Sequence, residues 1–385
     1  MIGKSHGKKR KNAMRILIIG INIRHIVRSA SLAGHEVIAV DCYCDLDLAR
    51  YAKETARMPR EGAGDRLQFY VDQFCPDAVV LGPGLEESSV KNALVLNNPR
   101  EKTAQVSDKL WLASWLEKNG FPFIKTQPLD SLRDPLYPFL VKPRKGAGGV
   151  GCRIVRDACQ QQAIRPGEEL IAQELISGLP ASVSVIGNGR KALAISANEQ
   201  LIGVPWAGSK GFRYSGNITP LQITPLQAFQ GGMERMAEEI ISGLGLVGSN
   251  GVDFLLTEKG PVVVEVNSRF QGSLDTVELS GGMNVFQAHL QSFRGMLPEK
   301  PAPASRSAGR IILYSPCDQN IVADLEKDWT ADVPAKGSRI AADDPMLSIL
   351  ATGAGRDDVL AKLKMRSAMI CNMLKKSKMR DFPGF

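Results

Sequence analysis

Apolar runs and helical patterns alternate along the first hundred residues. Residues 16–19 form an unbroken aliphatic run, and the apolar positions of 23–30 follow at helical spacing. A second aliphatic run covers 37–40, and a further helix and strand are predicted at 67–74 and 78–81. Because strands that alternate with helices build parallel sheets, this region is predicted to be a small Rossmann-like α/β unit.

The pattern changes after residue 100. An apolar face predicts one helix over 101–118, which Asn119 and Gly120 end. Short strands then replace the alternating units, so the whole chain is predicted to be α/β (α+β), with two or three domains in its 385 residues. The later elements are predicted at 139–142, 152–155, 171–206 (several short strands), 234–244 (helix), 252–256, 262–266 and 357–374 (helix).

Apolar runs and charge argue against two classes of protein. No hydrophobic run exceeds four residues, whereas a membrane span needs about 20, so we expect no membrane segment. The basic N-terminus has no apolar stretch of a signal peptide behind it. Residues 1–13 hold five cations and no acid, which leaves only +3 of the net +8 for the rest. We interpret 1–13 and the basic end at 375–380 as solvated segments, and expect no nucleic-acid partner.

Cysteine and histidine usage argues against two further kinds of site. The seven cysteines are odd in number and form no CxxC pair, so no disulfide framework is expected. The four histidines lack metal-ligand spacing, so no zinc site is expected. Free thiols fit a reducing compartment, which favours a cytoplasmic location.

A glycine-rich loop stands between two predicted strands. Its glycines are Gly146, Gly148, Gly149 and Gly151, which match G-x-G-x-x-G. A dinucleotide fingerprint needs a helix after this motif, but a β-branched strand follows here. We therefore predict a glycine hairpin whose amides cradle phosphate, with Lys142 just upstream. The alternative is a flexible surface turn.

Two acids are predicted to face each other across a hairpin. A symmetric turn near Lys259 pairs Asp253 with Glu265, and Asn267 shares their face because strand side chains alternate. Opposed like charges destabilise a sheet, and a divalent cation would remove the repulsion. Two carboxylates and an amide oxygen suit Mg²⁺, with Mn²⁺ as the alternative metal. A slipped register, with one acid facing solvent, is the competing interpretation.

Several short motifs become informative only in combination. They are Ser107-Asp108-Lys109, Phe139–Pro143, the glycine loop, Gln173-Glu174-x-Ile-x-Gly, Asp253, and Glu265-Val-Asn267-x-Arg269. In this order the chain resembles the carboxylate–amine (and carboxylate–thiol) ligases of the ATP-grasp superfamily. The resemblance is strongest to the predicted ATP-dependent carboligases, and more distant to tyramine–glutamate ligase and to biotin carboxylase-like enzymes.

The resemblance implies a fold and a domain plan. It implies a pre-ATP-grasp domain at 14–100, an ATP-grasp domain at 101–300, and a small β-rich cap at 301–385. A lid is implied at about 125–205. Caps of this kind often support dimers, so a homodimer is left open.

The resemblance also implies a role for individual residues. Lys109 and Lys142 would contact phosphates under the glycine loop, and Arg269 with Lys142 would act in catalysis. Asp253, Glu265 and Asn267 would hold Mg²⁺. Adenine and ribose would lie against Gln173, Glu174, Leu175, Ile176 and Ser182.

Substrate residues are the weakest part of the prediction. The glycine-rich segment 206–217 offers Lys210 and Arg213 for a carboxylate and Asn217 for a hydrogen bond. Arg24 and His25 follow the first strand, at the carboxyl edge where parallel sheets bind ligands. Solvated loop or helix-start residues are the alternative for all of them.

The function favoured by these observations is an Mg²⁺- and ATP-dependent ligase. It would activate a small-molecule carboxylate as an acyl phosphate and join it to an amine, in coenzyme or small-metabolite biosynthesis. One alternative is an NAD(P)-dependent oxidoreductase, because Asp41 falls about 20 residues after Gly20 in the first βαβ unit. A second alternative is an ATP-binding regulatory protein without catalysis.

Overall fold

The computed structural model describes residues 13–133, 135–164, 169–223 and 229–380. The predicted basic tail lies outside these residues except for Ala13, and so do the side chains of 376–380. Within the described ranges, no helix is both long enough and apolar enough to cross a membrane.

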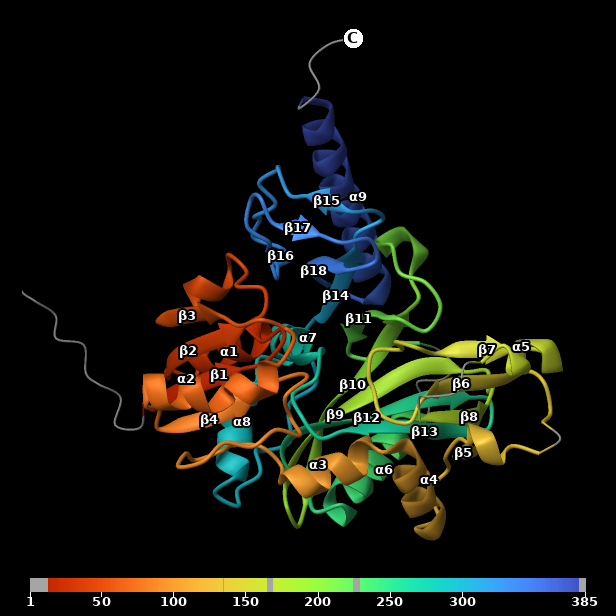
Figure 1. Ribbon diagram of the computed structural model, residues 1–385. Helices are drawn as coiled ribbons and strands as arrows, with labels where there is room; N and C mark the ends of the chain where they lie inside the picture. The colour runs from red at the N-terminus through yellow and green to blue at the C-terminus, as the bar shows by residue number, and fades with distance from the viewer. Residues whose placement is uncertain (1–12, 134, 165–168, 224–228, 381–385) are drawn as a thin grey trace, which may run out of the picture.

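A four-stranded parallel sheet forms the N-terminal unit, as predicted, and its strands lie in the order β3-β2-β1-β4 (Figure 1). Residues 16–19 of β1 and 78–81 of β4 are unbroken aliphatic runs, and all of them are buried. The elements are β1 (Arg15–Ile19), α1 (Arg24–Leu32), β2 (Glu36–Asp41), β3 (Glu54–Arg57), α2 (Leu67–Phe74) and β4 (Ala78–Leu81), with 3₁₀ turns at Leu48–Arg50 and Ala63–Arg66.

The predicted helix over 101–118 is wrong in one respect, because two helices occupy it. They are α3 (Arg100–Ser107) and α4 (Lys109–Lys118), and Asp108 between them has extended backbone angles. Its carboxylate accepts hydrogen bonds from the amides of Leu110 and Trp111, at 3.0 and 3.3 Å. Asp108 is therefore an N-cap that starts a new helix, a preference that the apolar spacing does not reveal.

A small antiparallel sheet carries the glycine loop. Its order is β5-β8-β6-β7, and Leu140 of β6 pairs with Ile154 of β7, which confirms the predicted hairpin. This sheet ends at Glu174, whereas the predicted lid continues to about residue 205. Its elements are β5 (Thr126–Pro128), β6 (Phe139–Pro143), β7 (Arg153–Val155), α5 (Ala158–Gln162) and β8 (Leu170–Glu174), with a 3₁₀ turn at Leu129–Ser131.

An eight-stranded antiparallel sheet spans the rest of the molecule, in the order β13-β12-β9-β10-β11-β14-β18-β16. Because β11 pairs with β14, the sheet runs without a break across the predicted domain boundary at 300/301. Its first part comprises β9 (Leu179–Asn188), β10 (Ala192–Ile202), β11 (Tyr214–Thr219), α6 (Gln230–Gly243), β12 (Val247–Thr257), β13 (Gly260–Asn267), α7 (Leu274–Gly281) and α8 (Val285–Ser292), with a 3₁₀ turn at Pro205–Ala207.

Strands β14, β18 and β16 continue this sheet, β15 and β17 pair as a separate two-stranded sheet, and a long helix lies beside them at the top of Figure 1. That helix, α9, begins at Arg356 and ends at Arg380, so it is longer than the predicted 357–374. The elements of this region are β14 (Ser307–Tyr314), β15 (Gln319–Asn320), β16 (Thr330–Ala331), β17 (Arg339–Ile340), β18 (Pro345–Gly353) and α9.

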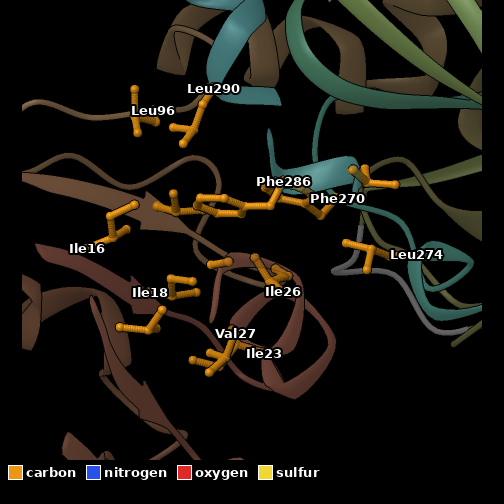
Figure 2. Close-up of a cluster of buried hydrophobic side chains, with 14 of the residues drawn as sticks. Ile16, Ile18, Ile23, Ile26, Val27, Leu96, Phe270, Leu274, Phe286 and Leu290 are labelled. Atoms are coloured by element: carbon orange, nitrogen blue, oxygen red, sulfur yellow. The ribbon is translucent and has the colours of Figure 1, made fainter. Parts of the chain in front are cut away.

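An apolar cluster docks the N-terminal unit against α7 and α8 (Figure 2). Ile16 and Ile26, which are fully buried, belong to the same cluster as Phe286 of α8. Phe270 stacks on Phe286 with ring centroids 5.8 Å apart. Burial of such large side chains contributes roughly 1.5–3 kcal/mol each, so this contact fixes the N-terminal unit on the central one.

A buried guanidinium joins three parts of the chain. Arg24 of α1 is 1% exposed and forms two hydrogen bonds to Asp275 of α7, at 2.9 and 2.5 Å. Its Nε lies 3.1 Å from Asp332, which follows β16, and 3.5 Å from Asp47. Asp332 also accepts a 2.7 Å bond from Arg310 of β14. Arg24 and Arg310 hold the pKa of Asp332 far below its ordinary value, despite the opposing effect of burial.

The glycine loop packs directly against the segment before β11. The amide of Tyr214 donates to the carbonyl of Gly148 at 3.2 Å. A Cβ on Gly149, whose φ is +75°, would lie 1.9 Å from the carbonyl oxygen of Phe212. Gly149 is therefore required by a close backbone approach, whereas a Cβ on Gly148 (φ +67°) would meet no atom within 4 Å.

Replacing Arg24 should destabilise the fold strongly. Arg24→Met removes a cation shared by three buried carboxylates, of which only Asp332 keeps another arginine, Arg310, so we expect the free energy of unfolding to fall by roughly 3–5 kcal/mol in urea titrations. The matched control is Arg50→Met, which breaks the exposed ion pair to Glu326 and should cost less than about 1 kcal/mol. Equal losses in the two variants would contradict the role assigned to Arg24.

Replacing Gly149 should free the segment that it contacts. Gly149→Ala forces the loop away from Phe212, so trypsin should cleave after the exposed Lys210 faster than in the wild type. Gly148→Ala carries the same backbone strain without the clash, and serves as the control. If both variants are cleaved at the same rate, the close approach at Gly149 does not hold the segment.

Candidate active site

A cavity of about 1020 Å³ lies where the three regions meet. Its wall includes residues of the N-terminal sheet, the glycine loop, the eight-stranded sheet and the C-terminal strands. Gly151 is not part of the wall, but the other residues predicted for nucleotide, metal and catalysis are. They are Lys109, Lys142, Gly146, Gly148, Gly149, Gln173, Glu174, Leu175, Ile176, Ser182, Asp253, Glu265, Asn267 and Arg269.

Two lysines approach the cavity from different elements. Lys109 is the first residue of α4, and its Nζ donates to the carbonyl of Gly146 at 2.8 Å, which ties the helix to the glycine loop. Lys142 of β6 is 5% exposed, and no ion pair within 4 Å joins it to any described residue. Burial lowers the pKa of Lys142, while the charge of Glu265 opposes the shift. A buried ammonium without a direct counterion fits an anionic ligand.

The register of the acidic hairpin is as predicted. Asp253 of β12 pairs with Glu265 of β13, and both face the cavity. Burial and the charge of Glu265 raise the pKa of Asp253 well above its ordinary value. The Asn267 amide donates to Asp253 at 3.2 Å and to Glu265 at 3.4 Å, so its N–H groups occupy a place where positive charge is favourable.

This donor set consists of two carboxylates and one amide. Among the described residues no group of three or more histidine, cysteine, aspartate or glutamate side chains could hold a metal. Hard oxygen donors of this kind fit Mg²⁺, which usually takes one or two carboxylates and leaves other positions to water and phosphate. The Asn267 nitrogen faces the two carboxylates, so the amide would have to turn over to present its oxygen to a metal.

Arg269 connects the acidic hairpin with the N-terminal unit. Its Nη2 donates to the Asn267 side-chain oxygen at 3.1 Å, and its Nε lies 2.8 Å from Glu86. Glu86 follows β4, at the carboxyl edge of the parallel sheet. The guanidinium therefore lies beside the carboxylate pair, with an orientation fixed from both sides.

The chain between β8 and β9 forms another part of the cavity wall. Residues 174–178 line it, and the backbone groups of Leu175 and Ile176 form no hydrogen bond with a described backbone group. Free backbone donors and acceptors in an apolar wall are suited to a flat heterocycle. Ser182, on β9, is 6% exposed and accepts a bond from Asn198 at 3.3 Å.

Of the five predicted substrate residues, His25 lines the cavity, whereas the other four, Arg24, Lys210, Arg213 and Asn217, do not. Arg24 and Asn217 are buried in polar networks, and Asn217 donates to Thr219 at 3.1 Å. Arg213 stacks on the ring of Tyr314 at 4.9 Å, and Lys210 is exposed. The polar atoms of Arg24, Asn217 and Arg213 already interact within the protein, which explains why these side chains do not reach the cavity. None of the four residues outside the wall enters the proposed site.

The dinucleotide alternative depends on Asp41, and the fold does not leave this acid open to a ligand. Asp41 is fully buried, and its Oδ1 accepts the amides of Tyr43 and Cys44 at 3.1 and 2.6 Å. The carboxylate thus closes a turn of its own loop and does not reach the cavity wall.

Some cavity residues had no assigned role in the sequence analysis. Glu86 is not part of the wall but pairs with Arg269, and it could have been found, because it follows a strand of the parallel sheet just as Arg24 and His25 do. Gln200 and Tyr214 lie on β10 and β11, and Arg310 on β14. These strands belong to one sheet whose strand order cannot be deduced from local spacing.

Comparison with known proteins gives a match to one family and to several relatives. Residues 106–273 match the family described as ATP-grasp domain. The chain is 26% identical over 360 residues to an uncharacterized protein of Methanocaldococcus jannaschii, which is 88% of each chain. It is 31% identical over 140 residues to the D-alanine–D-alanine ligase of Pediococcus pentosaceus, which is 34% of this chain and 38% of that enzyme.

Solved structures resemble the whole fold. The L-amino acid ligase of Bacillus licheniformis matches 93% of this chain and 98% of its own, with a TM-score of 0.67 and 19% identity. The biotin carboxylase domain dimer of Hydrogenobacter thermophilus 2-oxoglutarate carboxylase, solved with MgADP and bicarbonate, matches 91% of this chain and 89% of its own (TM-score 0.71, 15% identity). This protein therefore has the ATP-grasp fold and carries an ATP-grasp domain within residues 106–273.

Proposed function

We propose that this protein is an Mg²⁺- and ATP-dependent ligase that joins a small-molecule carboxylate to an amine. The observation that carries the proposal is the convergence of phosphate-type and metal-type groups in one cavity. Lys109, Lys142 and the glycine loop approach it from one side, and the Asp253–Glu265 pair with Asn267 and Arg269 from the other. The ligase name of a relative at 31% identity supports the reaction class.

The residues present fit the nucleotide and its metal. Lys142 offers a buried charge that no ion pair with a described residue satisfies, and the glycines offer backbone amides, so a triphosphate would meet both. Asp253, Glu265 and Asn267 would hold Mg²⁺. Bound there, the metal would neutralise negative charge on the phosphates during transfer.

The chemistry needs two balanced steps. The substrate carboxylate attacks the terminal phosphorus of ATP, which forms an acyl phosphate and releases ADP. The amine then attacks the carbonyl carbon, the C–N bond forms, the C–O bond to phosphate breaks, and the nitrogen loses a proton. Arg269 would stabilise the charge that develops on the transferred phosphoryl group, because its guanidinium lies beside Asn267 and the carboxylate pair that would hold the metal.

Water must be kept from the acyl phosphate. The β5–β8 sheet carries the glycine loop, and this loop contacts the segment before β11 through Gly148 and Gly149. Closure of this sheet over the cavity would complete the site and exclude water. Glu174, Leu175 and Ile176 would then hold the adenine at the edge of the closed cavity.

Nucleotide binding should depend on Mg²⁺ and on Glu265. A ligand at about 100 times its dissociation constant stabilises the native state by about 2.7 kcal/mol, so Mg²⁺ with an ATP analogue should raise the unfolding temperature. EDTA should reduce the rise, and Glu265→Gln should reduce it too. Glu258→Gln, in the exposed turn of the same hairpin, should leave it unchanged. A rise with NADPH alone would contradict the proposal.

Turnover should depend on the amine substrate. In a panel of carboxylates and amines, repeated ADP release in the steady state should need one member of each class, because the amine must remove the acyl group from phosphate before the next turnover. Lys142→Met should abolish ADP release, whereas the exposed Lys145→Met should retain it. ADP release that is independent of every amine tested would refute amide formation while leaving phosphoryl transfer intact.

A further inference from the structure

The end of β2 and the loop that follows it hold three aspartates, and the side chain of one of them has no hydrogen-bond or ion-pair partner among the described residues. Asp41 accepts two amides of its own loop, and Asp47 accepts the amides of residues 332–333 and lies near Arg24. Asp45 is 7% exposed and lines the cavity. No ion pair or side-chain hydrogen bond joins it to any residue that the structure describes.

Negative charge is in excess around Asp45. Burial raises its pKa to about 8, and the charges of Asp332, Asp41 and Asp47 add to the shift. The two buried arginines of the cluster are committed elsewhere: Arg24 to its own carboxylates, and Arg310 to Asp332, Ser348 and the carbonyl of Gly272. Arg57 and Arg60 also line the cavity, but both are exposed, so water screens their charge.

A buried histidine with no partner lies in the same wall. His25 is 4% exposed, and neither ring nitrogen has a hydrogen-bond partner. Burial lowers its pKa to about 3, with Arg310 adding to the effect, so the ring is neutral and offers one acceptor nitrogen. The charge of Asp332, which also lines the cavity, acts on both His25 and Asp45. Unpaired polar groups of this kind cost free energy unless a ligand satisfies them.

We propose that Asp45 and His25 bind a primary ammonium group of a substrate. An ammonium brings three donors and one positive charge, so it would favour the ionised form of Asp45 on binding and could also donate to the neutral imidazole nitrogen of His25. A substrate carboxylate would be repelled from the same place. The inference rests on the proposed ligase function and assigns the chemical class of one substrate.

The recognised ammonium is not the reacting nitrogen. Pairing with a carboxylate stabilises the protonated form of an amine, and a protonated amine has no lone pair with which to attack an acyl phosphate. The substrate therefore carries an additional amino group. Either the acid has one, as an α-amino acid does, or the amine is a diamine.

Binding of matched probes tests the assignment. The full chain with Mg²⁺ and a non-hydrolysable ATP analogue is titrated by calorimetry with L-alanine against L-lactate, and with cadaverine against pentanediol. In at least one pair the ammonium compound should bind about tenfold more tightly, which is about 1.4 kcal/mol. The alanine pair reports an amino acid as the acid, and the cadaverine pair reports a diamine.

Substitutions of Asp45 and His25 test whether these residues cause the tighter binding of the ammonium compound. Asp45→Asn should abolish the preference for the ammonium compound, and His25→Phe, which fills similar space, should weaken it. Asp65→Asn changes an exposed acid of the same unit and should leave it intact. Asp45→Asn should not lower the unfolding temperature, because the acid that it replaces is unpaired, whereas loss of a carboxylate that is paired within the fold would lower it.

The outcomes separate this inference from the function on which it rests. If the wild type shows no Mg²⁺–nucleotide shift, the ligase proposal fails. If the shift is present and retained in Asp45→Asn, the ammonium site alone is under test. Equal binding of charged and neutral probes, no binding of any probe, or a preference that survives Asp45→Asn would each overturn it.

Discussion

The Arg24 guanidinium is held by carboxylates from three parts of the chain: Asp47 in the N-terminal unit, Asp275 on α7 and Asp332 beyond β16. Removing charges from water is expensive, and the cost is offset only when the partners meet with good geometry. The three regions must therefore be docked correctly before the cluster is favourable. The same docking creates the cavity, because its wall needs residues from all three.

The cavity wall is electrically uneven. Lys109, Lys142 and Arg269 supply positive charge near the glycine loop and the acidic hairpin, whereas near the loop after β2 the wall holds the ionised Asp332 and the unpaired acid Asp45. A triphosphate and a cationic substrate would therefore be sorted by charge before any shape recognition takes place. Burial strengthens this sorting, because fewer water molecules screen the field.

Local spacing in the sequence was enough to predict the parts of the site that lie on hairpins. The pairing of Asp253 with Glu265 and the glycine turn after Lys142 are both confirmed, because a hairpin brings near neighbours together. The partners of Arg24 are up to 308 residues distant, so its side-chain position required the tertiary fold. The break at Asp108 was missed for a different reason: capping competes with an apolar pattern that continues through it.

The eight-stranded sheet has a mechanical consequence. Since β11 and β14 share backbone hydrogen bonds, the C-terminal strands move as one body with the floor of the cavity. The β5–β8 sheet has no such ladder to the floor, since its four strands pair only with one another. Opening and closing of the cavity would therefore be a movement of this small sheet against the eight-stranded sheet. The short connections at the two ends of the small sheet would take up the change in backbone angles.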